Sequence, residues 1–280
     1  MKTKIIISTF ALAICFTATA QGTYAGFGAS YGLPVGGNVL GYISSENMVY
    51  NTSIVENVKG SFGSGFTIGS YFGYMFNENM GFEIGVNYLW GKKYNFSNKT
   101  DYGNGTYSNS TDEVSASSFR ISPEVRMGFG DGKFRPYLKG GMTVGLFNKI
   151  VDSYTENAKS PMNIGEDITE KRFELTKGNS VGITGAFGVN YSINGTVFVF
   201  AELTSYLVNW SPLKGEFTKA TFNGTDQLGS MTISQKQFEF KNTVDDSMNT
   251  DVNSPTLTLK KYFPMSSFGF SIGMHFAFGK

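Results

Sequence analysis

Cysteine and histidine are almost missing from this chain of 280 residues, which contains one of each, Cys15 and His275. Cys15 lies in the N-terminal segment that we expect to be removed, so the mature chain would have no disulfide and no thiol chemistry. No group of histidine, cysteine and acidic residues has the spacing of zinc ligands. The sequence therefore excludes a disulfide-stapled fold and predicts neither a metal site nor a cofactor.

An excess of charge of either sign is also missing. The chain has 23 lysine and arginine residues against 22 aspartate and glutamate residues. Removal of Lys2 and Lys4 with the N-terminal segment leaves 21 basic residues against the same 22 acidic ones. A net charge near zero gives no basis for nucleic-acid binding, and no nucleic-acid partner is predicted.

Long apolar runs are missing beyond residue 20, although a helical membrane span needs roughly 18 or more apolar residues. The apolar run Ile5–Phe16 follows two lysines and precedes the small residues Ala18-Thr19-Ala20. This order is typical of a cleaved secretory signal peptide. We predict a signal peptide at residues 1–20 and a mature domain at residues 21–280. Lipid attachment at Cys15 is a weaker alternative, because the residue before it is bulky where lipidation signals have a small one.

Glycine and phenylalanine are abundant, with 35 and 26 residues, and they alternate along the chain. Because a strand points its side chains alternately to opposite faces, this alternation predicts β structure. In one segment, for example, Phe82 and Ile84 share a face and Glu83 lies on the other. The pattern predicts about eight strands, at Thr23–Leu33, Phe62–Phe76, Met80–Trp90, Ser118–Phe129, Pro136–Phe147, Val181–Tyr191, Val197–Leu207 and Phe268–Lys280. Each is long enough to cross a bilayer when tilted.

The connections between these strands alternate in length. Short turns rich in Asn, Asp and Gly occupy residues 77–79, 130–133 and 192–195, and long polar connections occupy residues 34–60, 91–117, 148–180 and 209–264. Short turns at one end and long loops at the other are the layout of a membrane barrel, whose closure leaves no strand edge unpaired in lipid. We therefore predict an all-β fold: a closed up-and-down antiparallel transmembrane barrel of about eight strands, with short periplasmic turns and long extracellular loops.

The C-terminal stretch contains Ser271, Gly273, Phe276 and Phe278 in sequence. This tail, together with the strand count and the loop alternation over residues 21–280, resembles the small outer-membrane barrels of Gram-negative bacteria, of the OmpA/OmpX type. The resemblance implies a location in the bacterial outer membrane, contact with its lipid, and recognition of these four residues as an assembly signal by the barrel assembly machinery. One departure is Gly279-Lys280, since many family members end on the aromatic residue itself.

Charged residues concentrate on the inward face of the predicted barrel. Three acids and three bases have the small-residue parity, as does the lone histidine: Glu83, Arg120, Glu124, Arg126, Lys139, Glu202 and His275. Unpaired charges in a narrow lumen are costly, so we expect a network of salt bridges that fills an eight-stranded interior. A narrow channel for ions or small solutes is an alternative. A further one is a membrane-embedded hydrolase that uses His275 with an inward serine and Glu202.

The long connections are the remaining candidates for function. Residues 209–264 are too many for a simple connector, and Gly215–Phe222, Met231–Phe240 and Thr256–Phe263 within them could prolong strands above the membrane. We therefore predict a non-enzymatic outer-membrane protein with an envelope structural or surface-binding role. Its extracellular loops would contact a surface ligand that the sequence does not identify.

Overall fold

The computed structural model describes residues 22–163, 165–245, 247 and 249–278. The predicted signal peptide and the terminal Gly279-Lys280 lie outside the described residues. Within these ranges, no helix is both long and apolar enough to span a membrane.

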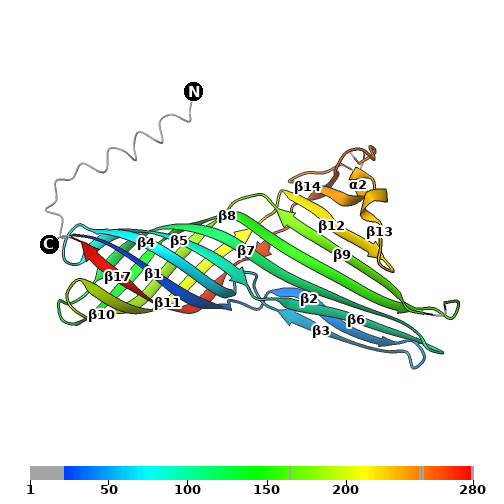
Figure 1. Cartoon of the computed structure of the whole chain (residues 1–280), viewed down its shortest axis with the longest axis horizontal. Helices are drawn as coiled ribbons and strands as arrows, with labels where there is room; N and C mark the ends of the chain where they lie inside the picture. Colours follow the sequence, from blue (N-terminus) through cyan, green and yellow to red (C-terminus); the bar gives the residue numbers. More distant parts are fainter. Residues whose placement is uncertain (1–21, 164, 246, 248, 279–280) are drawn as a thin grey trace.

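Eight antiparallel strands form a closed ring, seen at the left of Figure 1. In order around the ring they are β1 (Gly22–Pro34), β4 (Gly65–Met75), β5 (Met80–Gly91), β7 (Thr106–Gly128), β8 (Phe134–Lys159), β10 (Ser180–Ser192), β11 (Val197–Trp210) and β17 (Ser267–Phe278). The ring closes where β17 pairs with β1, so no strand edge is left unpaired. The described residues contain 17 strands in all, so the predicted number of about eight applies to the ring and not to the whole chain.

Tight turns join β4 to β5, β7 to β8 and β10 to β11 at the end of the ring that also holds both ends of the described chain (Figure 1). In the first turn, the Asn77 side-chain oxygen accepts hydrogen bonds from the backbone N–H groups of Asn79 at 2.9 Å and Met80 at 2.8 Å. In the third turn, the Asn194 side-chain oxygen accepts a hydrogen bond from the backbone N–H of Val197 at 2.8 Å. These asparagines replace backbone partners within the turn, as their sequence pattern predicts.

The two faces of the ring differ as the alternation predicts. Outward side chains are large, apolar and exposed: Phe27 is 53%, Ile84 43% and Met142 54% exposed. Inward side chains are small or polar and buried, with Glu83 1% and Thr143 0% exposed. An apolar outer band around a polar interior is the surface that a bilayer requires of a barrel.

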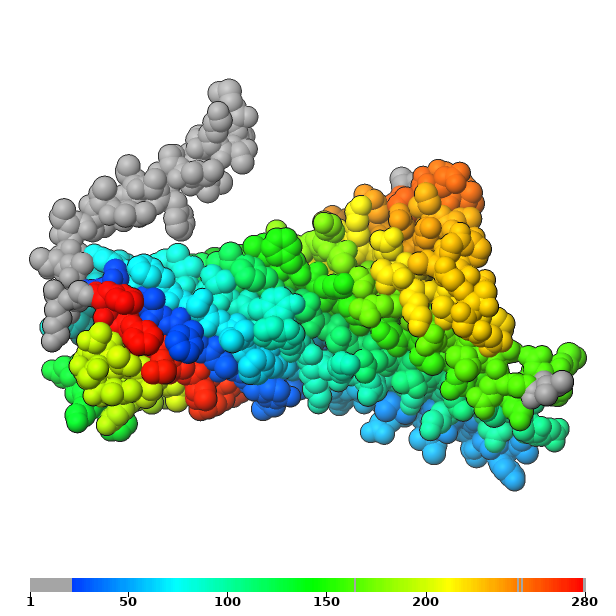
Figure 2. All heavy atoms as spheres, in the orientation of Figure 1, coloured from blue at the N-terminus to red at the C-terminus, as the bar shows by residue number. Residues whose placement is uncertain are grey.

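The long connections are largely β structure, whereas we expected polar loops outside three segments of residues 209–264. Their strands belong to the same 17-stranded sheet as the ring, and we call this outer part of the sheet the crown. It consists of β2 (Val39–Asn47), β3 (Thr52–Lys59), β6 (Tyr94–Gly103), the outer halves of β7 and β8, β9 (Asp167–Thr176), β12 (Lys214–Phe222), β13 (Thr225–Asp226), β14 (Gln237–Lys241), β15 (Thr256–Leu259) and β16 (Phe263–Pro264). The short helices η2 (Leu228–Ser230) and α2 (Ile233–Lys236) lie between β13 and β14. Of the three segments that we expected to prolong strands, residues 215–222 lie in β12 and residues 256–259 form β15, but residues 231–240 contain the helix α2 before β14 begins. Figure 2 shows the crown extending far beyond the ring at the end opposite the turns.

For residues 34–60, 91–117 and 148–180 the expectation of loops was wrong, because the crown strands there carry Ser, Thr, Asn and charged residues that resemble loop composition. β7 pairs with β8 from Tyr107 opposite Lys159 down to Gly128 opposite Tyr137, so a single hairpin spans both the membrane and the crown. The parallel pairings of β2 with β6 and of β14 with β15 also join segments that are distant in sequence. Polar composition therefore did not indicate irregular structure in these segments. They are strands because their backbones pair with neighbouring strands.

A buried amide marks the junction between ring and crown. β8 bends at Phe147, whose φ of 51° is left-handed, and the next residue, Asn148, is 1% exposed. The Asn148 oxygen accepts a hydrogen bond from Ser118 Oγ on β7 at 2.6 Å, and its nitrogen donates to Gly145 O at 3.1 Å and to Ser180 Oγ on β10 at 3.3 Å. This side chain ties three strands together at the level where the crown leaves the ring.

Candidate functional site

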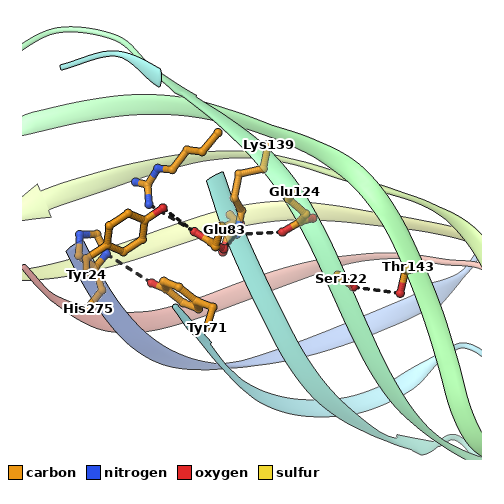
Figure 3. Close-up of polar contacts among 10 residues, drawn as sticks. Tyr24, Tyr71, Glu83, Ser122, Glu124, Lys139, Thr143 and His275 are labelled. Atoms are coloured by element: carbon orange, nitrogen blue, oxygen red, sulfur yellow. Dashed lines mark hydrogen bonds and ion pairs between the residues drawn. The ribbon is translucent and has the colours of Figure 1, made fainter. Parts of the chain in front are cut away.

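Lys139 is the centre of the charge network inside the ring. Its Nζ lies 2.9 Å from Glu83 Oε1, 3.0 Å from Glu202 Oε2 and 3.8 Å from Glu124 Oε2. The contact with Glu202 Oε2 is a charge contact, because the hydrogen bond to this residue runs to Oε1 at 3.4 Å. Figure 3 shows Glu83 between Lys139 and Tyr24. One ammonium group therefore compensates carboxylates from three different strands, β5, β7 and β11.

Tyrosines complete this network on the side of the short turns. Tyr24 OH donates to Glu83 Oε2 at 2.9 Å, and Arg126 approaches the same oxygen at 3.6 Å. The Arg126 guanidinium lies over the Tyr137 ring, 4.1 Å from its centroid. Hydrogen bonds and aromatic faces thus satisfy both buried charges, as a buried ion pair requires.

Arg120 and His275 lie apart from this centre. Arg120 is 2% exposed, its Nη2 has no hydrogen-bond partner among the described residues, and its guanidinium lies 5.0 Å from the centroid of the Tyr206 ring. His275 Nδ1 lies 3.3 Å from Tyr71 OH, and its ring stacks on Phe198 with centroids 4.8 Å apart. The Glu202 carboxylate is directed at Lys139 and not at the His275 ring.

The lumen is nearly filled at the level of Lys139. The cavity lined by Lys139, Glu83, Glu124 and Glu202 has a volume of about 50 Å³, room for roughly one or two water molecules. A vestibule of about 660 Å³ opens on the side of the short turns and reaches Arg126 and His275. Solutes that enter this vestibule meet the charge network and not an open path.

A compact apolar cluster, which we call the mouth core, closes the lumen at the crown end. At its centre, Phe62 is 4%, Leu89 0%, Trp210 0% and Met265 1% exposed. Phe62 N donates to Pro264 O and Met265 N donates to Val208 O, each at 2.9 Å. Residues 62–64, which the sequence placed at the start of a strand, instead fold inward, and β4 begins at Gly65. A Cβ on Gly63 would overlap Met265 O, so these two segments can approach only because residue 63 is glycine.

Above the mouth core, the inner face of the crown contains a cleft of about 740 Å³. We call it the crown cleft. Aromatic and aliphatic side chains form most of its walls: Phe96, Val114, Ile150, Phe173, Leu175 and Phe263. Its polar lining includes Asn98, Asp112, Asp152 and Lys261. A volume of this size and an apolar wall with few polar groups are typical of small-molecule sites.

The two aspartates of the crown cleft lie on adjacent strands. Val114 on β7 is directly opposite Asp152 on β8, and Asp112 is two residues further along β7 on the same face. Burial and then the Asp112 carboxylate raise the pKa of Asp152 to about 6, and burial raises the pKa of Asp112. Both shifts mean that these carboxylates lack a compensating cation.

Every inward residue that the sequence indicated lies inside the ring, but only five of the seven join one network. Glu83, Glu124, Arg126, Lys139 and Glu202 make ion pairs with one another, whereas Arg120 and His275 contact aromatic rings. Sequence reasoning missed Tyr24, Tyr71 and Tyr137, and it missed Asp112 and Asp152 entirely. The inward parity could have indicated the tyrosines. No pattern in the sequence brings the two aspartates together.

The predicted assembly residues occupy both faces of β17. Ser271 is buried and faces Glu202, and Phe278 is 52% exposed on the outer face. Gly273 faces the lumen, where a Cβ would lie 2.5 Å from the Phe200 ring. Their role as a signal for the assembly machinery stays a prediction.

The ring, its apolar outer band and its polar interior define a β-barrel protein of a membrane. The chain belongs to the outer membrane protein beta-barrel domain family, whose model matches residues 8–225, and it is located in the bacterial outer membrane. Solved structures similar to it include two outer-membrane proteins. OprG from Pseudomonas aeruginosa has 11% identity and a TM-score of 0.42 over 93% of this chain and 98% of that one. The outer membrane protease OmpT from Escherichia coli has 9% identity and a TM-score of 0.31 over 95% and 99%. No curated protein matches the chain.

Proposed function

We propose that this protein binds a small ligand at the cell surface through its crown, without catalysing a reaction, and that the ring is a closed anchor. The observation that carries the proposal is the obstruction of the lumen at two levels. The Lys139 network leaves a cavity of about 50 Å³, and the mouth core places four nearly fully buried apolar side chains above it. The crown cleft, by contrast, offers about 740 Å³.

The alternatives from the sequence have less support. In a channel, each ion would have to pass both the ion pairs of Lys139 and the mouth core. Removing water from an ion at these two levels is costly. A hydrolase would need an acid to orient His275. The groups around its ring are Tyr24, Tyr71 and Phe198, which supply aromatic packing and a phenol.

The closed ring is tested by conductance in planar lipid bilayers. Purified protein should give no current steps above those of a protein-free bilayer, because the ion pairs of Lys139 and the mouth core both block the path. Steady ohmic steps that grow with protein concentration would contradict the proposal and support the channel.

Binding at the crown is tested with three fluorescent probes of one ring system: acridine, 9-aminoacridine and acridine-9-carboxylate. The protein is placed in nanodiscs of zwitterionic lipid, with empty nanodiscs as the blank. Val114→Phe narrows the cleft and should weaken the binding of whichever probes bind. Val151→Phe adds the same volume on the opposite face of the crown, next to Asp152, and should leave binding unchanged. If none of the three probes binds, or if Val114→Phe has no effect, the proposed function is wrong.

A further inference from the structure

Acidic side chains of the crown differ sharply between its two faces. On the outer face three glutamates of β7 and β9 have a basic partner: Lys93 lies 2.8 Å from Glu113, Lys149 2.7 Å from Glu174, and Lys219 2.7 Å from Glu170. On the inner face, Asp112 and Asp152 have no ion pair and no side-chain hydrogen bond within the described residues, and Asp152 Oδ1 is fully buried without a partner. These outer-face glutamates are thus ion-paired, whereas the two aspartates in the cleft are not.

The basic residues nearest the cleft do not compensate these two acids. Lys171 turns to the Tyr154 ring, with its Nζ 5.9 Å from the ring centroid. Lys261 lines the cleft, but it forms no ion pair with either aspartate in the part of the chain that the structure describes. A buried carboxylate without a partner costs free energy. Asp112 and Asp152 are half-buried, and Asp152 Oδ1 is fully buried. Two such carboxylates without a counter-charge at one cleft indicate a partner that comes from outside the chain.

We infer that the crown cleft is a receptor site for small organic cations with an apolar body, such as aromatic or branched amines, and that Asp112 and Asp152 bind the cationic group. This inference rests on the proposed function and adds the class of ligand. The apolar walls formed by Phe96, Ile150 and Leu175 would cover the hydrocarbon part. The two carboxylates would accept charged hydrogen bonds at one side of it, in surroundings that strengthen such bonds.

The composition of the site favours an organic cation over the other ligand classes. A neutral apolar molecule would fill the cleft but leave both carboxylates unpaired, and an anion would be repelled by them. A calcium ion takes six to eight oxygen ligands, whereas the described residues contain no group of three or more His, Cys, Asp or Glu side chains that could hold a metal. Aromatic rings such as Phe96 and Phe173 also attract a cation through their faces.

The three acridines test the ligand class, because they share a ring system and differ in charge. At pH 7.5, 9-aminoacridine is a cation, acridine is neutral and acridine-9-carboxylate is an anion. We expect the cation to bind at least about tenfold more tightly than acridine, the factor that one charged hydrogen bond contributes. The anion should bind more weakly than acridine. The measurement is fluorescence titration of the full-length protein in zwitterionic nanodiscs at physiological salt.

Conservative variants assign the preference to the two aspartates. In Asp112→Asn/Asp152→Asn, the preference for the cation over acridine should fall to about twofold or less, whereas acridine itself should bind as before. Glu113→Gln is the matched control. It removes one negative charge from the residue next to Asp112, but on the outer face, so the cation preference should be unchanged. The control separates a contact in the cleft from general attraction by an acidic surface.

Four results would overturn the inference: equal affinity for the cation and acridine, a preference that survives in the double variant, an equal loss in Glu113→Gln, or displacement of 9-aminoacridine by millimolar calcium, which would indicate a metal site. Binding of acridine without charge preference would leave the proposed function intact and remove only the ligand class. Folding of each variant is checked on gels, where the unheated sample of a folded barrel migrates differently from the heated sample. Should the double variant fail to fold, the single variants Asp112→Asn and Asp152→Asn provide the same comparison.

Discussion

Replacement of Lys139 by methionine tests whether the lumen is held closed by its charge network. The substitution retains most of the apolar stem and removes the ammonium group that contacts Glu83, Glu124 and Glu202 at 2.9–3.8 Å. The Lys139 side chain is 9% exposed and those of the three acids are 1–8% exposed. Glu83 keeps Arg126 at 3.6 Å, so two of the three carboxylates lose the one cation within 4 Å among the described residues.

The expected destabilisation follows from that burial. Removal of one partner from a buried ion pair costs on the order of 3–5 kcal/mol, because the other charge stays buried without compensation. Glu202→Gln should cost less, since Lys139 retains Glu83 and Glu124. The double variant Lys139→Met/Glu202→Gln should be more stable than Lys139→Met by roughly 0.5–3 kcal/mol, the usual coupling energy of contacting residues.

The assay is urea unfolding in lipid vesicles, followed by the fluorescence of the two tryptophans. Lys133→Met is the matched control, because Lys133 is exposed in the turn before β8 and undergoes the same chemical change. Its unfolding midpoint should match that of the wild type. If Lys139→Met unfolds at the same urea concentration as Lys133→Met, or if Glu202→Gln adds to its destabilisation, the network does not hold the lumen as described.

Three further predictions concern the crown, the assembly signal and the topology. Burial and then Asp112 raise the pKa of Asp152 from 3.8 to about 6, so the folded state binds more protons than the unfolded state between these values and stability should rise as pH falls from 7 to 4. Asp152→Asn should remove this rise and stabilise the protein at pH 7.5 by on the order of 1 kcal/mol after solvent screening; an unchanged pH profile would contradict the assignment. Truncation after Gly273 should leave unfolded, protease-sensitive protein in the periplasm, and normal outer-membrane levels would refute the assembly role. An epitope tag at Gly224 in the crown should be accessible to antibody on intact cells, and a tag at Gly132 should become accessible only after the outer membrane is opened; the reverse pattern would invert the barrel.

The structure also shows how a barrel of this size can lack an open pore. Eight strands leave an interior about as wide as its own side chains, and this chain fills it with Tyr24, Tyr71, Tyr137 and the charges around Lys139. Inward glycines make room for these rings: a Cβ on Gly73 would overlap the Tyr24 ring, and one on Gly188 would lie 2.6 Å from Tyr137. Tyrosine rings therefore fill much of the space beside the small-residue face that the sequence predicted.

The membrane-spanning part was predictable because its environment imposes a pattern on every strand. Lipid requires large apolar side chains on alternate positions, and the narrow lumen requires small or polar ones on the others. The parity of Glu83, Lys139 and Glu202 is therefore sufficient by itself to place all three inside the ring. Turn residues such as Asn77 and Asn194 marked the short connections for an equally local reason, since an asparagine side chain can satisfy turn amides.

Tertiary structure alone decided which of these inward charges meet and what the long connections form. Parity places a side chain on a face, but the register between strands sets its neighbours, so Lys139 reaches Glu83 and Glu202 while Arg120 lies against Tyr206. Outside the membrane there is no lipid to require apolar side chains at alternate positions. Most crown strands therefore have the polar composition of loops. Asp112 and Asp152 are far apart in sequence and become neighbours only through the pairing of β7 with β8. The sequence determined the barrel because lipid acts on each residue separately; the crown cleft depends on contacts between distant residues, which only the folded chain creates.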